Sequence, residues 1–565
     1  MTLHSRFFRF VSAVSCGTLI ALPLQNGYVS SAAPDAATTF TNSLRALQDA
    51  ENAAPRDHWD PTYVEGQLGR DPARTFAWVR DHTYWIPYHG ILRGPAGVLM
   101  DRQGDSLDRA LLLATMLKDE GLTVRLAHGT MARSRAETLM PALLTARTLR
   151  DAAPKAERPA LDVSSVAAKY ELDPAPIQRT LAAQMASRAA QRRTLEAHFN
   201  SQVRRLTAAV DQTGADAASR ARERAIAALA DHWWVEVQVN GVWQPRDLLA
   251  DEAAGAHAAD RTLDVTALPA DLYHQITLRV VAEQWSGGTT VEHTALEQTM
   301  RAPDVLGQPI ALQFTPGEAV QSFPTPGLDP AASVRANALA QHEWTPSLYV
   351  GKQHVVQNAI TDAGTITAPS NGADALGVAK GVAHGLGDAI AGVFGPAPAT
   401  PAAPPPAPGV LSAVWIEYAI AVPGEPTQVI RRQIFDLPGP ARRASKSATW
   451  TLDDAGRLAR GLALMTSTEI LPVNSEFSPQ YVAHLSRAGI LANGALVSDV
   501  LSGKIADDFQ GAQAASARFV PTGGSLYGLA LQRLNRSPVA PFIYVDRPEI
   551  LSRHLFLSLK GTTLT

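Results

Sequence analysis

The chain has 565 residues, of which 46% are hydrophobic, and its formal net charge at pH 7 is −3. The length predicts three or four domains, and the composition is that of an ordinary globular protein. The weak net charge gives no argument for a nucleic-acid partner. The single cysteine, Cys16, excludes an intramolecular disulfide and a multi-thiolate metal site.

Residues 1–32 have the pattern of a secretory signal peptide. Met1–Arg9 is basic, Phe10–Leu24 is apolar, and Ser30–Ala32 offers a small-residue cleavage site. Cleavage there would remove Cys16 and leave a mature chain without any thiol. A lipid anchor on Cys16 is an alternative, which the continuing apolar run disfavours. No later segment is apolar and long enough to span a bilayer, so we expect a secreted or periplasmic protein without a transmembrane helix.

A helix is predicted to begin at Asp71-Pro72, because aspartate is a good N-cap and proline is favoured at the first helical position. Residues 84–99 follow and are predicted to form a loop and a short strand. Trp85 in this stretch could border a cleft, but core packing is the preferred interpretation.

A helix is predicted to start at Asp105-Ser106 and to stop at Gly121, with a short strand after it. A residue at a helix N-terminus lies in positive potential, which favours the thiolate of a cysteine. The hydroxyl of Ser106 would gain far less from this potential and would need a histidine as general base. The alternative is that Ser106 is only a cap of the helix.

Residues 132–230 are rich in alanine and arginine and are predicted to form an inserted helical hairpin. An apolar stripe begins at Pro176 and reaches Val210 at helical spacing. Five arginines cluster on this segment, namely Arg188, Arg192, Arg193, Arg204 and Arg205. They are interpreted as a solvated helix face, with a docking surface or a lid as the alternative.

The stretch from Asp231 to Asp251 has strand periodicity, followed by a hairpin turn at Asn240-Gly241. His232 lies at the start of the first strand, and Asp247 lies on the return strand or just beyond it. The chain order of nucleophile, histidine and aspartate suits a triad of Ser106, His232 and Asp247. The alternative for His232, which stands beside Trp233 and Trp234, is a packed core histidine.

These stretches resemble the core of the transglutaminase-like superfamily, which shares its architecture with papain-type proteases. That core has Gly-x-Cys-x-Asp/Glu-x-Ala on a helix, an Ala-Arg-x-Val-x-Gly-like strand, then His-x-Trp-Val-Glu and Trp-x-Pro-x-Asp. Ser106 stands at the position of the nucleophilic cysteine, and His232 and Asp247 stand at the other two catalytic positions. The upstream residues Tyr84, Tyr88, Gly90, Leu92-Arg93-Gly94 and Leu99 resemble the Tyr-x-x-Tyr-x-Gly-x-Leu-Lys-Gly run of a bacterial branch whose members often lack that cysteine.

The resemblance spans roughly residues 71 to 251 and implies a papain-like fold. We therefore predict an α+β protein whose transglutaminase-like domain covers 40–265, with the helical insertion at 132–230. Alternating apolar residues then predict a β-rich domain at 266–440, interrupted by a Gly/Ala/Pro-rich linker at 366–409. Residues 441–565 are predicted to be mainly helical.

Two functions from different classes follow from this sequence. The preferred one is a binding or scaffolding pseudoenzyme of the cell envelope, whose partner is a protein or an envelope polymer. The alternative is a Ser106-His232-Asp247 acyl transferase or amide hydrolase that acts on protein or peptide substrates, with an oxyanion held by backbone N–H groups. No metal or other cofactor is expected, because no two histidines stand at ligand spacing beside carboxylates.

Overall fold

The structure is a computed structural model that describes residues 56–58, 60–152, 218–249, 259–306, 310–318, 330–350, 353–370, 409–445, 450–475 and 544–554, with short pieces within 162–182, at 204 and within 559–564. The predicted signal peptide with Cys16, most of the predicted helix after Pro176, and residues 371–408 of the predicted linker lie outside the described residues. Of the five clustered arginines, only Arg204 is described, and it is helical. The described residues combine helices with several sheets, which confirms the α+β class.

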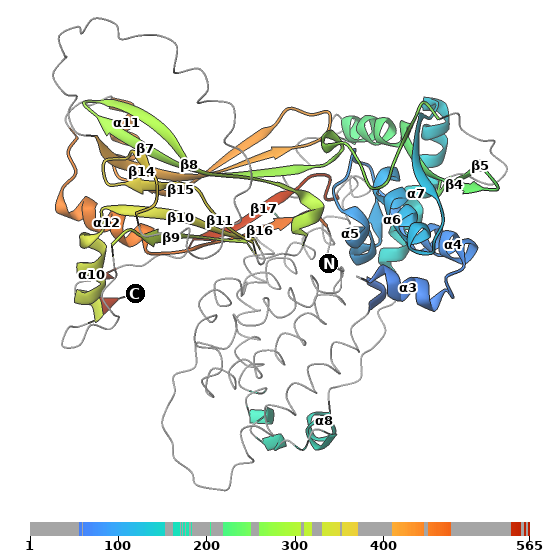
Figure 1. Ribbon diagram of the computed structural model, residues 1–565, viewed down its shortest axis with the longest axis horizontal. Helices are drawn as coiled ribbons and strands as arrows, with labels where there is room; N and C mark the ends of the chain where they lie inside the picture. The colour runs from blue at the N-terminus through green and yellow to red at the C-terminus, as the bar shows by residue number, and fades with distance from the viewer. Residues whose placement is uncertain are drawn as a thin grey trace, which may run out of the picture.

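The N-terminal part packs helices against a four-stranded antiparallel sheet of order β5-β4-β3-β6 (Figure 1). Its helices are η1 (Arg56–His58), α3 (Pro61–Gln67), α4 (Pro72–His82), α5 (Gly94–Asp101) and α6 (Ser106–Asp119). Its strands are β3 (Val124–Thr130), β4 (Asp231–Val239), β5 (Val242–Arg246) and β6 (Arg261–Leu263), and the short strands β1 (Tyr84–Trp85) and β2 (Gln103–Gly104) pair in parallel. Helix α5 begins inside the stretch 84–99, which was predicted to be loop and strand, and ends beyond it at Asp101.

Helix α6 is the centre of this part, and it begins and ends where the sequence predicts. The Asp105 side chain caps it by accepting from the N–H of Asp108 at 2.7 Å. Gly121, with a φ of 92°, follows the C-cap Glu120. Most residues of the helix between these caps are buried, so the burial of its apolar side chains contributes to the stability of the fold.

The β4–β5 hairpin also follows its prediction. Asn240 and Gly241 have φ values of 51° and 81°, the left-handed conformation that a type I′ turn requires. Strand β4 pairs antiparallel with β3, so that His232 lies opposite Gly129. Asp247 is the first residue after β5.

The described part of the insertion is helical. It contains α7 (Arg133–Ala152), α8 (Val163–Lys169) and a helix over residues 218–230. Apolar residues of α7 and of the 218–230 helix pack around Trp85, which is 1% exposed. The preferred interpretation of Trp85 as a core residue is therefore confirmed.

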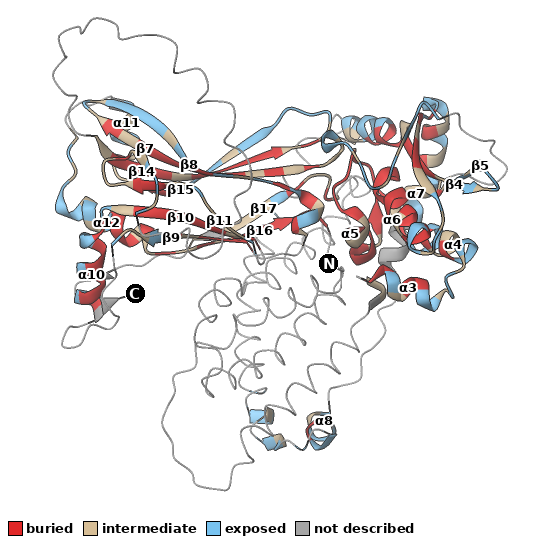
Figure 2. Cartoon of the chain, in the orientation of Figure 1, coloured by how far each residue is buried: buried red, intermediate tan, exposed pale blue. Residues whose placement is uncertain are grey.

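The rest of the described chain is a β-sandwich (Figures 1 and 2). One sheet has the order β15-β14-β7-β8, and it contains β7 (Gln275–Ser286), β8 (Thr289–Arg301), β14 (Val410–Ala421) and β15 (Gln428–Asp436). The other has the order β13-β12-β10-β9-β16-β17, with β11 on β10. Its strands are β9 (Ile310–Pro316), β10 (Glu343–Val350), β11 (Gln353–Val356), β12 (Ala359–Thr361), β13 (Ile366–Thr367), β16 (Thr468–Val473) and β17 (Glu549–His554).

The two sheets bury one apolar core between them, as Figure 2 shows by the red strands that face each other. The short helices η2 (Ala270–Leu272), η3 (Ala302–Val305), α10 (Pro330–Ala340), α11 (Gly439–Ser445) and α12 (Asp454–Leu464) lie between strands in the sequence. The β14–β15 hairpin joins the β7–β8 hairpin across the predicted linker, with Ile416 opposite Val280.

The prediction of a mainly helical region after residue 440 is wrong for its described part. Beside α11 and α12, this part contains β16, β17, β18 (Leu559–Lys560) and β19 (Thr563–Leu564). Strands β16 and β17 complete the second sheet, so the sandwich extends beyond the predicted 266–440 span. Pro472 argued against a strand here, because proline cannot donate a hydrogen bond inside a sheet. The strand tolerates it because β9 pairs only with residues 468–470 of β16.

The loop of residues 86–94, which we call the junction loop, connects the N-terminal part to the sandwich. Its Ile91 N–H donates to Leu272 O at 2.6 Å, and the Asn474 side chain donates to Leu92 O at 3.2 Å. Gly90 has a φ of 84°, and a Cβ there would lie 2.5 Å from Pro423. Only glycine therefore fits at this contact. Among the described residues, no helix has the length and apolar character needed to cross a membrane.

Candidate functional site

Ser106 lies at the N-terminus of α6, directly against strand β4. Its hydroxyl donates to the carbonyl of Asp231 at 3.1 Å and accepts from the N–H of Trp233 at 3.2 Å. These two residues flank His232, so the serine is held beside the imidazole that the sequence paired with it. Both bonds go to backbone, and Ser106 is only 3% exposed. The hydroxyl therefore fastens the helix to the strand.

His232 and Asp247 are brought together as the sequence predicts. Nε2 of His232 lies 2.8 Å from Oδ2 of Asp247, and the second Asp247 oxygen accepts from the N–H of Leu249 at 2.8 Å. The hairpin turn produces this contact, because it returns β5 beside β4 in the register that leaves Asp247 near the start of β4. A carboxylate on one ring nitrogen orients an imidazole, as in a triad.

The neighbourhood of this pair is closed. The side chains of His232 and Asp247 are 1% and 8% exposed. The Trp234 ring stacks on the His232 ring at a centroid distance of 5.7 Å, and Trp234 is itself 1% exposed. Among the described residues, the serine hydroxyl, the imidazole and the carboxylate are therefore all buried rather than presented to solvent.

Arg109, one turn along α6 from Ser106, adds a buried cation to this region. Its Nε donates to the hydroxyl of Thr83 at 2.9 Å. Burial lowers the pKa of Arg109 to about 10, against the opposing influence of the Asp247 and Asp105 carboxylates. The guanidinium is therefore charged at neutral pH, and Asp247 interacts with two basic groups, His232 and Arg109.

Asp108 connects the first turn of α6 to the upstream residues 88–94. One of its oxygens accepts from the N–H of Leu92 at 3.1 Å, from that of Arg93 at 2.8 Å and from the Tyr88 hydroxyl at 2.6 Å. The other accepts from the N–H of Gly94 at 2.8 Å. Asp108 is fully buried. The acidic position of the helix motif thus holds residues 88–94 in place.

The sequence reasoning missed a second cluster of ionisable groups beside Ser106. Asp231 Oδ1 lies 2.7 Å from Nε2 of His128, and its Oδ2 lies 3.0 Å from Nδ1 of His89. Nδ1 of His128 lies 2.6 Å from Asp260. Pairing of β3 with β4 creates this cluster, since Thr130 lies opposite Asp231. An antiparallel alignment of the two motif stretches would have placed His128 near Asp231.

The chemistry of this cluster follows from its contacts. Both ring nitrogens of His128 face carboxylate oxygens, which only accept, so the imidazole carries both protons and a positive charge. The hydrogen bond to Asp231 raises the pKa of His128, burial opposes this, and Asp260 raises it further. Burial of Asp231 works against its charge, but hydrogen bonds with His128 and His89 hold the pKa of its carboxyl well below the usual range.

Replacing Asp231 with asparagine should lower the pKa of His128, because the strongest contact that favours the imidazolium is lost. The imidazole signals in an NMR pH titration measure this pKa. The variant Asp260→Asn should produce a smaller decrease. A pKa of His128 that is unchanged in both variants would contradict the assigned hydrogen bonds.

Because folding raises the pKa of His128, the protonated imidazole stabilises the folded protein. The contribution of His128 to the free energy of unfolding is fully present below about pH 6.5, the ordinary pKa of histidine, and is lost as the pH rises through the raised value.

In the part of the chain that the structure describes, no group of three or more histidine, cysteine or acidic side chains could hold a metal ion. No family model, curated protein or solved structure matches this chain.

Proposed function

We propose that this chain is a secreted protein with a transglutaminase-like, papain-like core that has lost nucleophilic catalysis and acts by binding a protein or a cell-envelope polymer. The arrangement of the core supports the family assignment. A buried helix presents its N-terminus to an antiparallel strand that carries His232, and Asp247 follows the neighbouring strand. This order of elements is what the resemblance implies.

The observation that carries the loss of catalysis is the hydrogen bonding of Ser106. A serine nucleophile must give its proton to a general base within hydrogen-bond reach. The Ser106 proton goes instead to the carbonyl of Asp231, and the oxygen accepts from the N–H of Trp233. Attack on a carbonyl would require both bonds to break inside a buried site.

The enzyme alternative is favoured by one specific contact, the 2.8 Å distance between His232 and Asp247. In that case Ser106 would be an acyl transferase or amide hydrolase nucleophile, and a rotation of its side chain toward His232 would complete the triad. The contact has a structural explanation as well, since a buried imidazole requires hydrogen-bond partners.

A fluorophosphonate probe separates the two functions. We expect no labelling of the purified native protein under conditions in which an active serine hydrolase is labelled completely. The variant Ser106→Ala is the control, with circular dichroism to verify its fold, since the lost bonds cost about 1–3 kcal/mol. Labelling of the native protein that disappears in Ser106→Ala would establish the enzyme alternative and refute loss of catalysis.

The binding function has its own measurement, which is co-sedimentation with purified envelope polymer or capture of envelope proteins. We expect Ser106→Ala to bind as the native protein does, because the hydroxyl is turned toward β4 and away from any partner.

A further inference from the structure

The β-sandwich contains a cavity of about 380 Å³ at its open side, and all of its lining residues belong to the sandwich. Strands β15 and β17 are the edge strands of their two sheets, and residues from both line the cavity. The lining residues include Ile416, Arg432, Ile434, Ile550, Ser552 and His554. Cavities of roughly 300–1,000 Å³ hold small molecules in proteins.

Arg432, Ser552 and His554 lie on the inner faces of their sheets, where apolar residues are expected, while the lining residue Gln433 lies on the other face of β15. Arg432 lies opposite Ile416, and the neighbouring pair on the same face is Ile430 with Tyr418. Ile416 and Tyr418 belong to the sandwich core. Arg432 therefore shares the inner face of β15, but at this edge of the sheet it is exposed to solvent.

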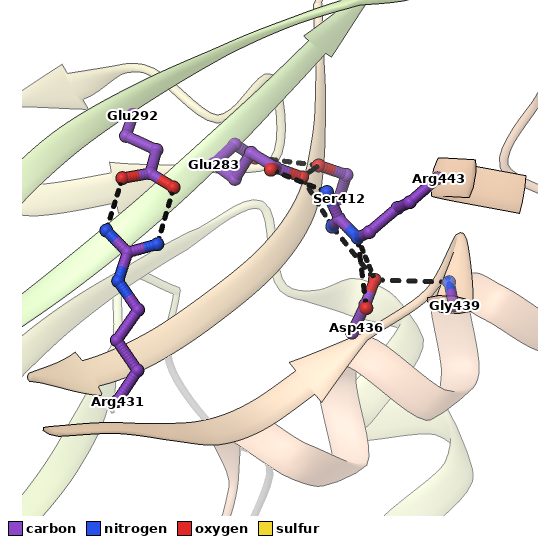
Figure 3. A network of polar contacts seen from close by, with 7 residues as sticks. All are labelled: Glu283, Glu292, Ser412, Arg431, Asp436, Gly439 and Arg443. Carbon is purple, nitrogen blue, oxygen red and sulfur yellow. Dashed lines mark hydrogen bonds and ion pairs between the residues drawn. The ribbon is translucent and has the colours of Figure 1, made fainter. Parts of the chain in front are cut away.

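Arg431, the preceding residue, shows how different this environment is. Its guanidinium binds Glu292 through two bonds of 2.8 and 2.6 Å and also contacts Glu417, on the outer face of the same sheet (Figure 3). From helix α11, Arg443 binds the carboxylates of Glu283 on β7 and Asp436 on β15 (Figure 3). No ion pair joins Arg432 to a carboxylate within the described ranges of the chain.

The wall of the cavity that β16 and β17 form, across from Arg432, contributes hydroxyl and imidazole groups. His554 is satisfied by protein, because Nε2 lies 3.0 Å from the Thr466 hydroxyl and Nδ1 lies 2.8 Å from that of Thr468. The Thr466 hydroxyl donates to Ala463 O, so it accepts from Nε2–H, and Thr468 donates to Nδ1. Burial lowers the pKa of His554, so the imidazole is neutral. Among the described residues that line the cavity, Arg432 is therefore the positively charged one.

Ser552 is the hydroxyl group of β17 that lines the cavity. Tyr418 is not part of the lining: it is fully buried in the core, and its hydroxyl interacts with the Ser552 side chain. Burial raises the pKa of Tyr418 to about 12, so this hydroxyl keeps its proton and can donate.

We propose that this open side of the sandwich binds a small carboxylate with an aliphatic body. The Arg432 guanidinium matches a carboxylate through two parallel N–H donors. Ile416, Ile434 and Ile550 contact the aliphatic body, and Ser552 supplies a hydroxyl donor. The site is separate from the Ser106 region and does not depend on the function proposed for it.

A competing explanation exists for Arg432. Inward-pointing charges on edge strands protect a sheet from pairing with another chain. In that case Arg432 would prevent self-association, and the cavity would contain only water. Binding of a carboxylate that depends on Arg432 distinguishes these two explanations.

The test is calorimetric titration of the full chain with octanoate, with 1-octanol as the uncharged ligand of equal chain length. We expect saturable octanoate binding that Arg432→Gln weakens by about tenfold to a hundredfold, the loss of a charge-assisted bidentate contact. Arg431→Gln is the matched control, since it removes the same charge from the same strand on the opposite face. Binding of octanoate by this control should equal that of the native protein.

Several outcomes would overturn the proposal. These are no saturable octanoate binding, equal loss of affinity in Arg431→Gln and Arg432→Gln, and octanol binding as tight as octanoate binding. Self-association of Arg432→Gln without any change in octanoate affinity would establish edge protection instead. Methyl NMR signals of Ile416, Ile434 and Ile550 should shift with octanoate, and shifts confined to other isoleucines would also refute this site.

Discussion

Replacing Asp108 with asparagine should lower the free energy of unfolding by about 3–5 kcal/mol. The carboxylate accepts from the N–H groups of Leu92, Arg93 and Gly94 and from the Tyr88 hydroxyl. Asparagine has nearly the same shape, but its NH₂ group would face donors. With the amide oxygen at the position that accepts three bonds, the NH₂ group would face the N–H of Gly94. This buried donor would lose its acceptor at a cost of about 1–3 kcal/mol, and the other three hydrogen bonds would lose the carboxylate charge that strengthens them.

Hydrogen exchange measured by mass spectrometry gives the local result. Peptides that cover the junction loop and the start of α6 should exchange faster in Asp108→Asn, because Asp108 connects these two segments. Asp119→Asn is the control, since Asp119 is exposed at the far end of the same helix. If both variants had the same stability and the same exchange, Asp108 would not be the anchor of the junction loop.

Local signals in the sequence predict the helix start and the hairpin well. The N-cap Asp105, the stop at Gly121 and the Asn240-Gly241 turn each act within a few residues, so their outcome depends little on the rest of the chain. The sequence placed His232 and Asp247 on or beside neighbouring strands of this hairpin, and the hairpin register brings them into contact.

The partners of the Ser106 hydroxyl could not be predicted, because they depend on how α6 is placed against β4. A shift of one residue along β4 would have changed which backbone groups the hydroxyl meets. The sequence also gives no sign that Trp234 stacks on His232, which is a consequence of packing. Whether the motif residues support catalysis is therefore a question of tertiary geometry.

Strands β16 and β17 could not be recognised for a related reason. The sequences Thr-Glu-Ile-Leu-Pro-Val and Glu-Ile-Leu-Ser-Arg-His lack regular alternation, and they pair with each other across a long stretch of chain. Pairing of β16 with β9, and of β17 with β16, decides their conformation, which local propensity does not report. The cavity beside β17 was consequently beyond sequence reasoning as well.

The buried ion pair at the junction gives the second large effect. Arg93 is 0% exposed, and its Nε lies 3.1 Å from Asp101. Its Nη2 donates to Val545 O at 3.0 Å, so the same side chain connects the N-terminal part to the C-terminal segment. Asp101→Asn would leave the buried guanidinium without its carboxylate, and we expect a loss of about 3–5 kcal/mol.

A double-mutant cycle with Arg93→Met separates the pair from its surroundings. Each single variant leaves one buried charge without its counter-ion, so the double variant should cost clearly less than the sum of the two losses. The exposed pair Arg80–Asp81, with N and O 2.8 Å apart, is the control, and Asp81→Asn should cost less than about 1 kcal/mol. Additive losses would mean that Arg93 and Asp101 stabilise the junction independently. In that case the contact of Arg93 with Val545 O, and not the ion pair, would hold the two parts of the protein together.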